Sequence, residues 1–276
     1  MAFDFEFEPE RISPLAQIHA GAQIAEGVSI GPYAVIGPNV RIGSGTVVAH
    51  NATIIGHTSL GENNQVFPGA LLGGPPQDLK YAGGKTHLEI GRGNIFRECV
   101  TINTGTEKGG GVTKVGNDNF FMACSHLAHD CVVEDGVIVA NAVLFAGHIK
   151  VEKFAYISGG SAFHHFTTIG RLAFVGGLSR VTQDVPPFTI VEGNPAEVRG
   201  INVVGLRRRN MSEDATGALK KAFRLIYRSG LTRAEVLERL EANPSSLTDE
   251  VKYLLEFLRK IDRGKHGRAR EALRAE

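Results

Sequence analysis

A period of six residues governs the sequence from position 18 to position 181. Reading from Ile18, every sixth residue is aliphatic up to Leu72, and the pattern returns after two interruptions with Phe joining the aliphatic set. The 25 positions that follow it are Ile18, Ile24, Ile30, Ile36, Ile42, Val48, Ile54, Leu60, Val66, Leu72, Ile90, Phe96, Ile102, Val115, Phe121, Leu127, Val133, Val139, Phe145, Val151, Ile157, Phe163, Ile169, Val175 and Val181. A strict short repeat of this kind is the signature of a solenoid built from stacked units.

The remaining positions of each repeat explain the period. If the aliphatic residue is position one, position five is usually small, and both point to the same side of a strand because side chains alternate. Position four is rich in residues that tolerate a positive φ, namely Gly21, Gly27, Asn39, Gly45, Asn51, Asn63 and Gly69. Each repeat is therefore a short strand followed by a corner, and three repeats close a triangular coil of about 18 residues, with equivalent positions stacked about 4.8 Å apart. The sequence predicts a mainly β fold, a parallel β-helix with an aliphatic interior, whose hand the period does not define.

Two segments interrupt the repeat. Residues 73–89 lie between Leu72 and Ile90, and residues 103–114 shift the phase of the pattern by one residue. Both segments are polar and rich in glycine. Loops that protrude from a rigid scaffold tend to carry function, although a plain surface excursion is equally consistent with these residues.

The pattern becomes helical toward the C-terminus. Ser212 is placed to cap a helix that ends at Gly230. Residues 232–235, TRAE, form a capping box for a second helix, which we expect to break at Asn243–Pro244. Residues 248–262 carry an apolar stripe at helical spacing and predict a third helix.

These patterns divide the chain into two parts. We predict a β-helix with two protruding loops over residues 1–190 and a C-terminal α-helical domain over residues 191–276. A helical cap would protect the open end of a solenoid. The basic tail, residues 263–276, is expected to fray.

Charge and cysteine content narrow the class of protein. The net charge is only +1, but residues 201–276 carry 17 Lys and Arg against 11 Asp and Glu, whereas residues 1–200 carry 13 against 18. The C-terminal part should attract an acidic partner, unless its charge is simply that of a solvated helical surface. The three cysteines, Cys99, Cys124 and Cys131, show no C-x-x-C spacing and imply neither a disulfide framework nor a zinc ribbon, which fits a reducing compartment.

Nothing in the sequence indicates export or a membrane span. Residues 1–10 are acidic and lack the apolar segment of a signal peptide, and no apolar run approaches 18 residues. We therefore expect a cytoplasmic protein without an integral membrane segment. Nothing in the sequence suggests a nucleic-acid partner.

Histidines gather on one edge of the predicted prism. None of the ten occupies position one or five, so we expect their side chains to point outward. Those that form a column along one corner are His126, His129, His148, His164 and His165. Three interpretations remain open: corner residues in the left-handed conformation, which His and Asp visit more often than most; zinc ligands shared between neighbouring chains; or a general base whose tautomer is set by a carboxylate such as Asp130.

The chain resembles a known family, the UDP-N-acetylglucosamine O-acyltransferases, which belong to the left-handed β-helix acyltransferases. The resemblance spans nearly the whole chain and lies in GGPPQDLKY (73–81), EIGRGNIFRECVTINTGT (89–106), GGGVTKVG (109–116), HLAHDC (126–131), LFAGHI (144–149), VGGLSRVTQDVPPF (175–188), GNPAEVRGINVVGLRRR (193–209) and AFRLIYRSG (222–230). It implies a left-handed β-helix, a homotrimer with sites between neighbouring subunits, and no cofactor or metal. The reaction it implies is transfer of a 3-hydroxyacyl chain from acyl carrier protein to the 3-position of a UDP-sugar, the first step of lipid A synthesis.

Matched motif by motif, the resemblance also implies catalytic roles. His129 would be the general base, Asp130 would orient it or stabilise its charged form, and the Gly147 N–H would donate to the thioester oxyanion. The substrate's own hydroxyl or amine would attack, so no Ser or Cys nucleophile is needed. Cys131 stands at an inward position and is expected in the core.

The implied substrate-binding positions are more widely spread. Asp78 and Lys80 would meet the sugar nucleotide, and Gly177 would leave the acyl groove open for a longer chain. An Arg pair would hold the diphosphate or the phosphopantetheine phosphate. With these, the positions carried over by motif are His126, His148, His164, His165, Asn202, Arg208 and Arg209.

The chain departs from the family pattern at two positions, and two other functions remain alternatives to acyl transfer. The chain has His165 where the resemblance leads us to expect Gln, and Asn103 where it leads us to expect His, so the acceptor is left as a 3-hydroxy or a 3-amino sugar. The alternative enzyme is a zinc-dependent, γ-carbonic-anhydrase-like protein on the same scaffold, which predicts about one zinc per site and inhibition by chelators. A scaffold without catalysis is the third possibility. In that case His129→Ala would keep full activity.

Overall fold

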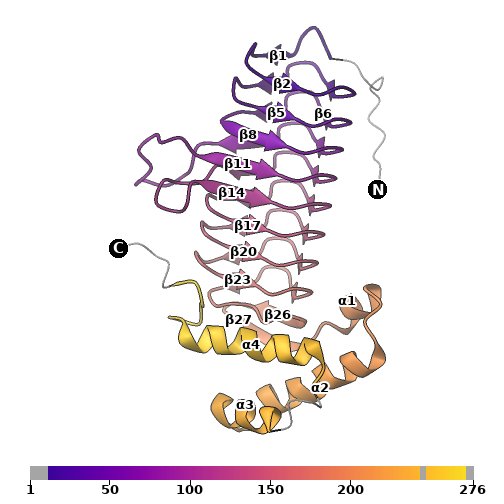
Figure 1. Ribbon diagram of the computed structural model, residues 1–276, viewed down its shortest axis with the longest axis vertical. Coiled ribbons are helices and arrows are strands. Elements are labelled where there is room, and N and C mark those ends of the chain that lie inside the picture. Colours follow the sequence, from indigo (N-terminus) through magenta and orange to yellow (C-terminus); the bar gives the residue numbers. More distant parts are fainter. Residues whose placement is uncertain (1–11, 243–246, 272–276) are drawn as a thin grey trace.

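The fold is a three-sided prism of short parallel strands with helices at one end (Figure 1). The computed structural model describes residues 12–242 and 247–271 of the chain. Successive strands pass in turn to three different sheets, so that neighbours within a sheet lie three strands apart in the sequence. The predicted left-handed parallel β-helix is confirmed.

We call the three sheets A, B and C. Sheet B contains β1 (Gln17–Ile18), β4 (Val35–Ile36), β7 (Thr53–Ile54), β10 (Leu71–Gly74), β13 (Thr101–Asn103), β16 (His126–Leu127), β19 (Leu144–Phe145), β22 (Ala162–Phe163) and β25 (Arg180–Val181). Sheet C contains β2 (Gln23–Ile24), β5 (Arg41–Ile42), β8 (His57–Leu60), β11 (His87–Ile90), β14 (Val112–Val115), β17 (Val132–Val133), β20 (Lys150–Val151) and β23 (Thr168–Ile169). Sheet A contains β3 (Ser29–Ile30), β6 (Val47–Val48), β9 (Gln65–Val66), β12 (Ile95–Phe96), β15 (Phe120–Phe121), β18 (Ile138–Val139), β21 (Tyr156–Ile157), β24 (Phe174–Val175), β26 (Thr189–Gly193) and β27 (Ala196–Ile201).

The six-residue period corresponds to the core of the prism. The aliphatic residues at position one stack in register, as in Leu72 beside Ile102 and Ile102 beside Leu127. They are buried from Ile30 onward, whereas Ile18 and Ile24 in the first coil are only half-buried because no coil covers them from above. Burial of this column supplies the main stabilising term of the β-helix, since apolar burial contributes about 25 cal/mol per Å².

The corners differ along the three edges of the prism. We name each edge by the sheets it joins in chain order: BC, CA and AB. At CA and AB corners the predicted positive φ is found, for example 73° at Gly27 and 56° at Asn51. Gly21 and Asn39, on the BC edge of the first coils, do not have a positive φ, whereas Asp130 further along that edge does, with 59°. The backbone conformation at the corners of the BC edge therefore differs between the first coils and the coil of His129 and Asp130.

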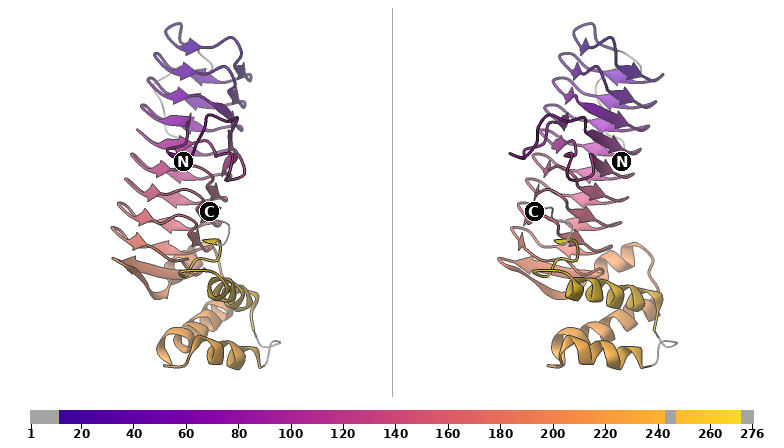
Figure 2. Two further views of the ribbon diagram at one scale, coloured as in Figure 1. Left: turned by 90° about the vertical axis from the view of Figure 1, so that its left-hand side faces the viewer. Right: turned by 60° about the vertical axis from the view of Figure 1, so that its left-hand side comes forward.

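Both interruptions of the repeat leave the prism at the BC edge. One lies between β10 and β11 and the other between β13 and β14, and Figures 1 and 2 show them projecting from the same side. They contact each other, because Gly84 N–H donates to Glu107 Oε1 at 2.6 Å and Thr86 Oγ1 donates to Thr104 Oγ1 at 3.0 Å. The two loops thus form one projection beside the histidine column.

The helices follow the predicted caps. Helix α2 (Glu213–Arg228) starts after Ser212, whose hydroxyl accepts from Ala215 N, and α3 (Arg233–Glu241) has both bonds of the predicted capping box. Helix α4 (Asp249–Arg263) is the third predicted helix. The expected break at Asn243–Pro244 lies outside the described residues.

Two features near the start of the helical part were not expected. A short helix, α1 (Val203–Arg208), precedes α2. Strands β26 and β27 extend sheet A as far as Ile201, so the predicted division between residues 190 and 191 falls inside β26. Helices α2 and α4 pack on this end of the prism around a second apolar cluster that includes Phe188, Leu219 and Leu254. Within residues 12–242 and 247–271, no helix has the length and apolarity needed to cross a membrane.

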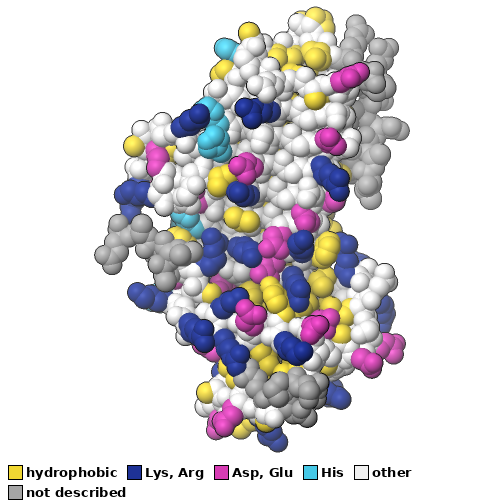
Figure 3. Space-filling view, in the orientation of Figure 1, with side chains coloured by type: hydrophobic (Ala, Val, Ile, Leu, Met, Phe, Trp, Pro, Cys, Tyr) yellow, Lys and Arg dark blue, Asp and Glu magenta, His cyan; other side chains and the backbone are white. Residues whose placement is uncertain are grey.

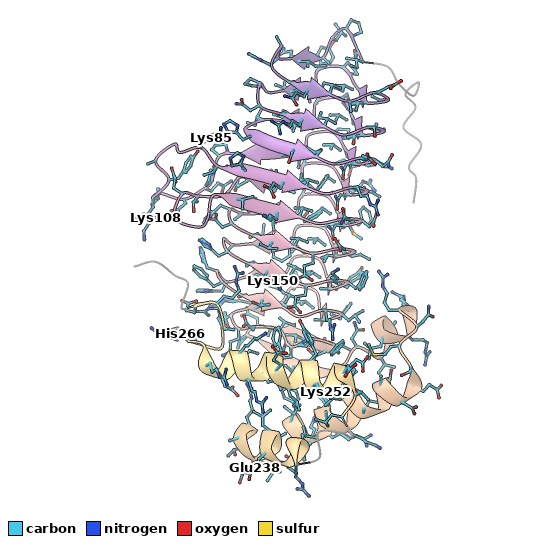
Figure 4. The ribbon with its side chains drawn as sticks, viewed as in Figure 1. Lys85, Lys108, Lys150, Glu238, Lys252 and His266 are labelled. Carbon is cyan, nitrogen blue, oxygen red and sulfur yellow. The ribbon has the colours of Figure 1, made fainter. Side chains whose placement is uncertain are left out.

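The expectation that the basic tail frays is wrong for residues 264–271. After α4 the chain turns back along the BC edge, where Asp184 Oδ2 accepts from Ala269 N at 2.8 Å and Asp184 N–H donates to Gly267 O at 2.8 Å. Figure 4 labels Lys108 on the protruding loops and His266 on this returning segment, and both lie on the same side of the prism. The tail is held because the last coil offers it a buried carboxylate and backbone partners.

Candidate active site

The centre of the histidine column is a hydrogen-bonded pair at the BC edge. His129 and Asp130 form the corner between β16 and β17, and His129 Nδ1 lies 2.8 Å from Asp130 Oδ2. Thr106, in the second loop, donates to the carboxylate twice, from its backbone N to Oδ1 at 2.9 Å and from Oγ1 to Oδ2 at 2.6 Å. Thr113 Oγ1 accepts from Asp130 N at 2.8 Å. The carboxylate is thus held from two sides.

This network keeps Asp130 ionised. Burial by itself would raise its pKa, but hydrogen bonds from His129 and Thr106 and the nearby His148 outweigh burial and lower the pKa below its ordinary value. An ionised carboxylate only accepts hydrogen bonds. His129 Nδ1 must therefore carry the proton of a neutral ring, which leaves Nε2 with a free lone pair.

His129 is buried within the chain, which its position in the repeat did not predict. The residue is 6% exposed, yet it does not belong to the aliphatic core. It points out of the prism, as its position in the repeat predicts. The ring of His148 covers it edge-on at a centroid distance of 5.2 Å, and the loop at Thr106 covers the adjoining carboxylate.

Gly147 makes room for the His129 ring. A Cβ atom at position 147 would lie 2.5 Å from His129 Cε1 and 2.8 Å from Nε2, closer than real Cβ contacts allow. The free nitrogen of His129 therefore adjoins the Gly147 backbone. Within the described residues, the Gly147 N–H has no hydrogen-bond acceptor. An imidazole nitrogen and a backbone N–H without an acceptor consequently stand side by side, the two kinds of group that a general base and an oxyanion donor require.

His148 is both a corner residue and part of the site. Its φ is 64°, which confirms the interpretation of position 148 as a left-handed corner. Its ring stacks on Phe166 at a centroid distance of 4.4 Å, and its Nε2 is 3.7 Å from Asp130 Oδ2. Burial lowers its pKa; Asp130 opposes the shift, while His129, Arg270 and His165 add to it. The ring is therefore neutral at pH 7.

The remaining predicted residues on this side of the prism lie in sheet B, at the next BC corner and in the first loop. His126 Nδ1 is 2.8 Å from Thr101 Oγ1, and burial together with His129 lowers the pKa of His126. His164 and His165 occupy the corner after β22, with ring centroids 5.5 Å apart. Asp78 and Lys80 lie in the first loop. Asp78 Oδ1 accepts from the Lys80 backbone N at 2.9 Å, in an exposed turn.

Four predicted residues lie on other edges. Asn202 caps α1, accepting from Gly205 N and donating to Leu172 O at the CA edge, and Arg209 stacks over Phe154 at 3.8 Å on the same edge. Arg208 is exposed in α1. Gly177 is at the AB edge, where the nearest atom to an added Cβ would be Gly159 O at 3.4 Å. One chain alone therefore does not unite the thirteen predicted residues.

One group of side chains in the described part of the chain could hold a metal ion. Ligand atoms of His129, Asp130 and His148 lie within 4.8 Å of one another. The carboxylate already accepts three hydrogen bonds, from Thr106 N, Thr106 Oγ1 and His129 Nδ1, at 2.6–2.9 Å. A metal would have to compete with these donors for the carboxylate oxygens, which have about four lone-pair sites in all. The arrangement fits an oriented base better than a metal centre.

Sequence reasoning missed two residues of the site. Thr106 and Thr113 hold Asp130, but neither stands near HLAHDC in the sequence. Thr106 lies in an interruption of the repeat, where position in the period gives no direction for a side chain. The only available signal was that this loop is polar and leaves a rigid scaffold.

Replacing Thr106 with Val should weaken catalysis and acid resistance together. The variant loses a hydrogen bond to a buried charge, worth about 2 kcal/mol, so the pKa of Asp130 rises. A carboxylate with a lowered folded pKa stabilises the fold above its unfolded pKa, and this contribution is lost as pH falls through the folded pKa. We expect acid unfolding, followed by circular dichroism, to begin at a higher pH. Thr106→Ser, which keeps the hydroxyl, should behave like the parent; equal shifts in both variants would contradict this assignment.

Comparison with known proteins now places the chain. Residues 11–43 and 21–56 match the family described as bacterial transferase hexapeptide (six repeats), and residues 184–266 match the second domain of the family described as UDP N-acetylglucosamine O-acyltransferase. The fold and repeat thus define a hexapeptide-repeat transferase. Among curated proteins, the acyl-[acyl-carrier-protein]–UDP-N-acetylglucosamine O-acyltransferase of Synechocystis is 51% identical over 77% of this chain and 76% of its own length. That of Anaeromyxobacter dehalogenans is 47% identical over 92% and 98%.

Solved structures agree with these relatives. A UDP-N-acetylglucosamine acyltransferase from Bacteroides fragilis superposes with a TM-score of 0.87 and 40% identity, over 90% of this chain and 97% of that one. The chain belongs to the UDP-N-acetylglucosamine O-acyltransferase family. The resemblance seen in the sequence is therefore confirmed, and the comparisons do not favour the γ-carbonic-anhydrase-like alternative.

Proposed function

We propose that the protein transfers a 3-hydroxyacyl chain from acyl carrier protein to the 3-position of UDP-N-acetylglucosamine or its 3-amino analogue. This would be the first step of lipid A biosynthesis, carried out in the cytoplasm. Family membership supports the reaction class. The observation that carries the mechanism is the free Nε2 of His129, which Asp130 orients against the Gly147 backbone.

The chemistry follows from this arrangement. His129 Nε2 takes the proton from the sugar hydroxyl or amine as its oxygen or nitrogen attacks the thioester carbon. The carbonyl oxygen becomes an oxyanion and accepts from the Gly147 N–H, while Asp130 stabilises the imidazolium. When the carbon–sulfur bond breaks, His129 returns the proton to the leaving thiolate. The product is an ester or an amide, and no enzyme nucleophile is consumed.

We further propose that the working form is a homotrimer. Residues assigned to one site lie on three edges of the prism, and adjacent edges of a triangle face different directions. Packing the BC edge of one subunit against another subunit would bring Arg208, Asn202 or Gly177 to His129. Leu79, fully exposed on the first loop between Asp78 and Lys80, is the kind of apolar tip that a neighbouring subunit would cover.

The C-terminal helices are the proposed docking region for acyl carrier protein. Figure 3 shows Lys and Arg side chains gathered over these helices and the adjoining coils, with acidic groups among them. Residues 201–276 carry six more basic than acidic residues. A surface of this charge would steer an acidic carrier toward the end of the prism next to the site.

We propose no cofactor and no metal for the reaction. The acyl group arrives on the phosphopantetheine of the carrier, and His129 supplies the base. The test is mass spectrometry of the product formed from UDP-N-acetylglucosamine, or its 3-amino analogue, with a panel of acyl-carrier thioesters. A UDP-sugar with an added 3-hydroxyacyl group, formed equally with and without a chelator, is the expected result. No acylated sugar from any thioester would end the proposal, and loss of turnover in chelator would revive the zinc alternative.

Arg208 is the cation we assign to substrate phosphate. Replacing it with Ala should raise KM for the nucleotide sugar or the carrier about tenfold or more, because a charge-assisted hydrogen bond contributes about 1.5–3 kcal/mol, while kcat changes less. Arg207→Ala, on the same exposed helix, is the matched control and should keep the parent KM in steady-state assays. An unchanged KM for both substrates in Arg208→Ala would remove Arg208 from the site.

A further inference from the structure

The segment after α4, residues 264–271, forms a strap along the BC edge. Asp184 on the last coil joins the strap to the prism: its Oδ2 accepts from Ala269 N at 2.8 Å, its Oδ1 accepts from Thr168 N at 2.7 Å, and its own N–H donates to Gly267 O at 2.8 Å. Asp184 is 7% exposed. A buried carboxylate that accepts from two backbone N–H groups holds the strap at a defined height on the edge.

A second set of contacts closes the strap on itself and on the coil. Arg268 Nε donates to Glu271 Oε2 at 2.7 Å, and both side chains are 7% exposed. Arg268 Nη1 also donates to Thr182 O at 2.5 Å. Gly267, with φ of 72°, lies so close to Gln183 that an added Cβ would approach its side chain to 2.7 Å. The strap is therefore packed against the prism over its length, not only at Asp184.

The strap ends beside the candidate active site. Arg270 Nη1 donates to the backbone carbonyl of His148 at 2.6 Å, a partner 122 residues away in the sequence. That carbonyl belongs to the Gly147–His148 corner, whose backbone adjoins the His129 ring. Within the described residues, two backbone hydrogen bonds also hold the corner, from Phe166 N to Gly147 O at 3.3 Å and from His148 N to His129 O at 3.0 Å. The bond from Arg270 is the shortest of the three and is charge-assisted.

We propose that Arg270 is a positioning residue, through which the C-terminal strap holds the Gly147–His148 corner in the geometry that catalysis needs. This inference rests on the proposed function. The bond acts on a strained position, because a non-glycine residue at φ of 64° is in a sparsely populated conformation. The His148 ring also covers His129, so a shift of the corner would move the oxyanion donor and the cover of the base together.

The test compares Arg270→Met, Arg270→Lys and Arg41→Met in the full chain. Met keeps most of the stem and removes every donor, Lys keeps one cation, and Arg41 is an exposed Arg in β5, remote from the site. We expect kcat of Arg270→Met to fall about ten- to a hundredfold, as for a misplacement of about 1 Å, with both KM values within about twofold. Arg270→Lys should recover part of the loss. Arg41→Met should match the parent.

Thermal unfolding and one double variant separate positioning from a purely structural role. The midpoint for Arg270→Met should stay within a few degrees of the parent, and adding His148→Ala to Arg270→Met should cost less than the two single losses combined. Full additivity, a parent-like kcat in Arg270→Met, or a kcat loss matched by the fraction unfolded would each overturn the inference. If the parent itself acylates no UDP-sugar, the proposed function fails instead, which the parent assay reveals before any variant is compared.

Discussion

Removing the imidazole at position 129 should lower kcat/KM by about 10²- to 10⁴-fold, the range for a general base. The structure gives the reason: Nδ1 is engaged with Asp130 at 2.8 Å, so Nε2 is the free atom, and it adjoins the Gly147 backbone. No other described group is both oriented by a carboxylate and placed against that backbone. Initial rates with UDP-N-acetylglucosamine and an acyl-carrier thioester measure the loss.

Two variants at position 129 are needed because the ring is buried. His129→Ala leaves the Asp130 carboxylate with one donor fewer and opens a cavity, so some loss of stability is expected as well. His129→Gln keeps a side-chain amide able to donate toward Asp130 but supplies no base. Both variants should be equally inactive, and the thermal unfolding midpoint of His129→Gln should be close to that of the parent. Activity of His129→Gln near that of the parent would show that His129 is structural and would favour the scaffold without catalysis.

Adding one methyl group at position 147 should be nearly as damaging. The Cβ of Gly147→Ala would lie 2.5 Å from His129 Cε1, so either the ring or the corner must move. The ring cannot move freely because Asp130 holds its other side. A displacement of about 1 Å at reacting groups costs about a hundredfold, and we expect kcat to fall by that order.

The matched control for this variant is Gly200→Ala. An added Cβ there meets nothing within 4 Å, so turnover and unfolding should stay at parent values. A crystal structure or a pH–rate profile of Gly147→Ala would then show whether His129 has been displaced. Parent-like turnover in Gly147→Ala would mean that the corner moves without displacing His129. The close approach of His129 to the Gly147 backbone would then not be needed for catalysis.

The sequence predicted those parts of the molecule that depend on its period. Position one gave the core, because a side chain two residues from another on a strand shares its face, and this held from Ile30 to Val181. Helix starts at Ser212 and Thr232 were readable because capping uses specific residues at specific spacing. The direction of His129 out of the prism followed from the same rule.

Features that depend on contacts between distant segments were not readable. The two donors of Thr106 reach Asp130 from an irregular loop, and Arg270 reaches His148 from a tail expected to fray. The burial of His129 depends on its neighbours in space, above all the His148 ring, and not on its position in the repeat. The site residues carried over by motif remain predictions until variants are assayed.

The distribution of the predicted residues over three edges has a genetic consequence. If subunits meet edge to edge, each chain contributes its BC edge to one site and its CA or AB edge to another. A lesion in His129 and a lesion in Arg208 on the same chain would then damage two different sites. In a cell that makes both parent and altered chains, mixed assemblies would keep some intact sites. Two defective alleles, one altered on the BC edge and the other on the CA or AB edge, would likewise form mixed assemblies in which some sites have no altered residue.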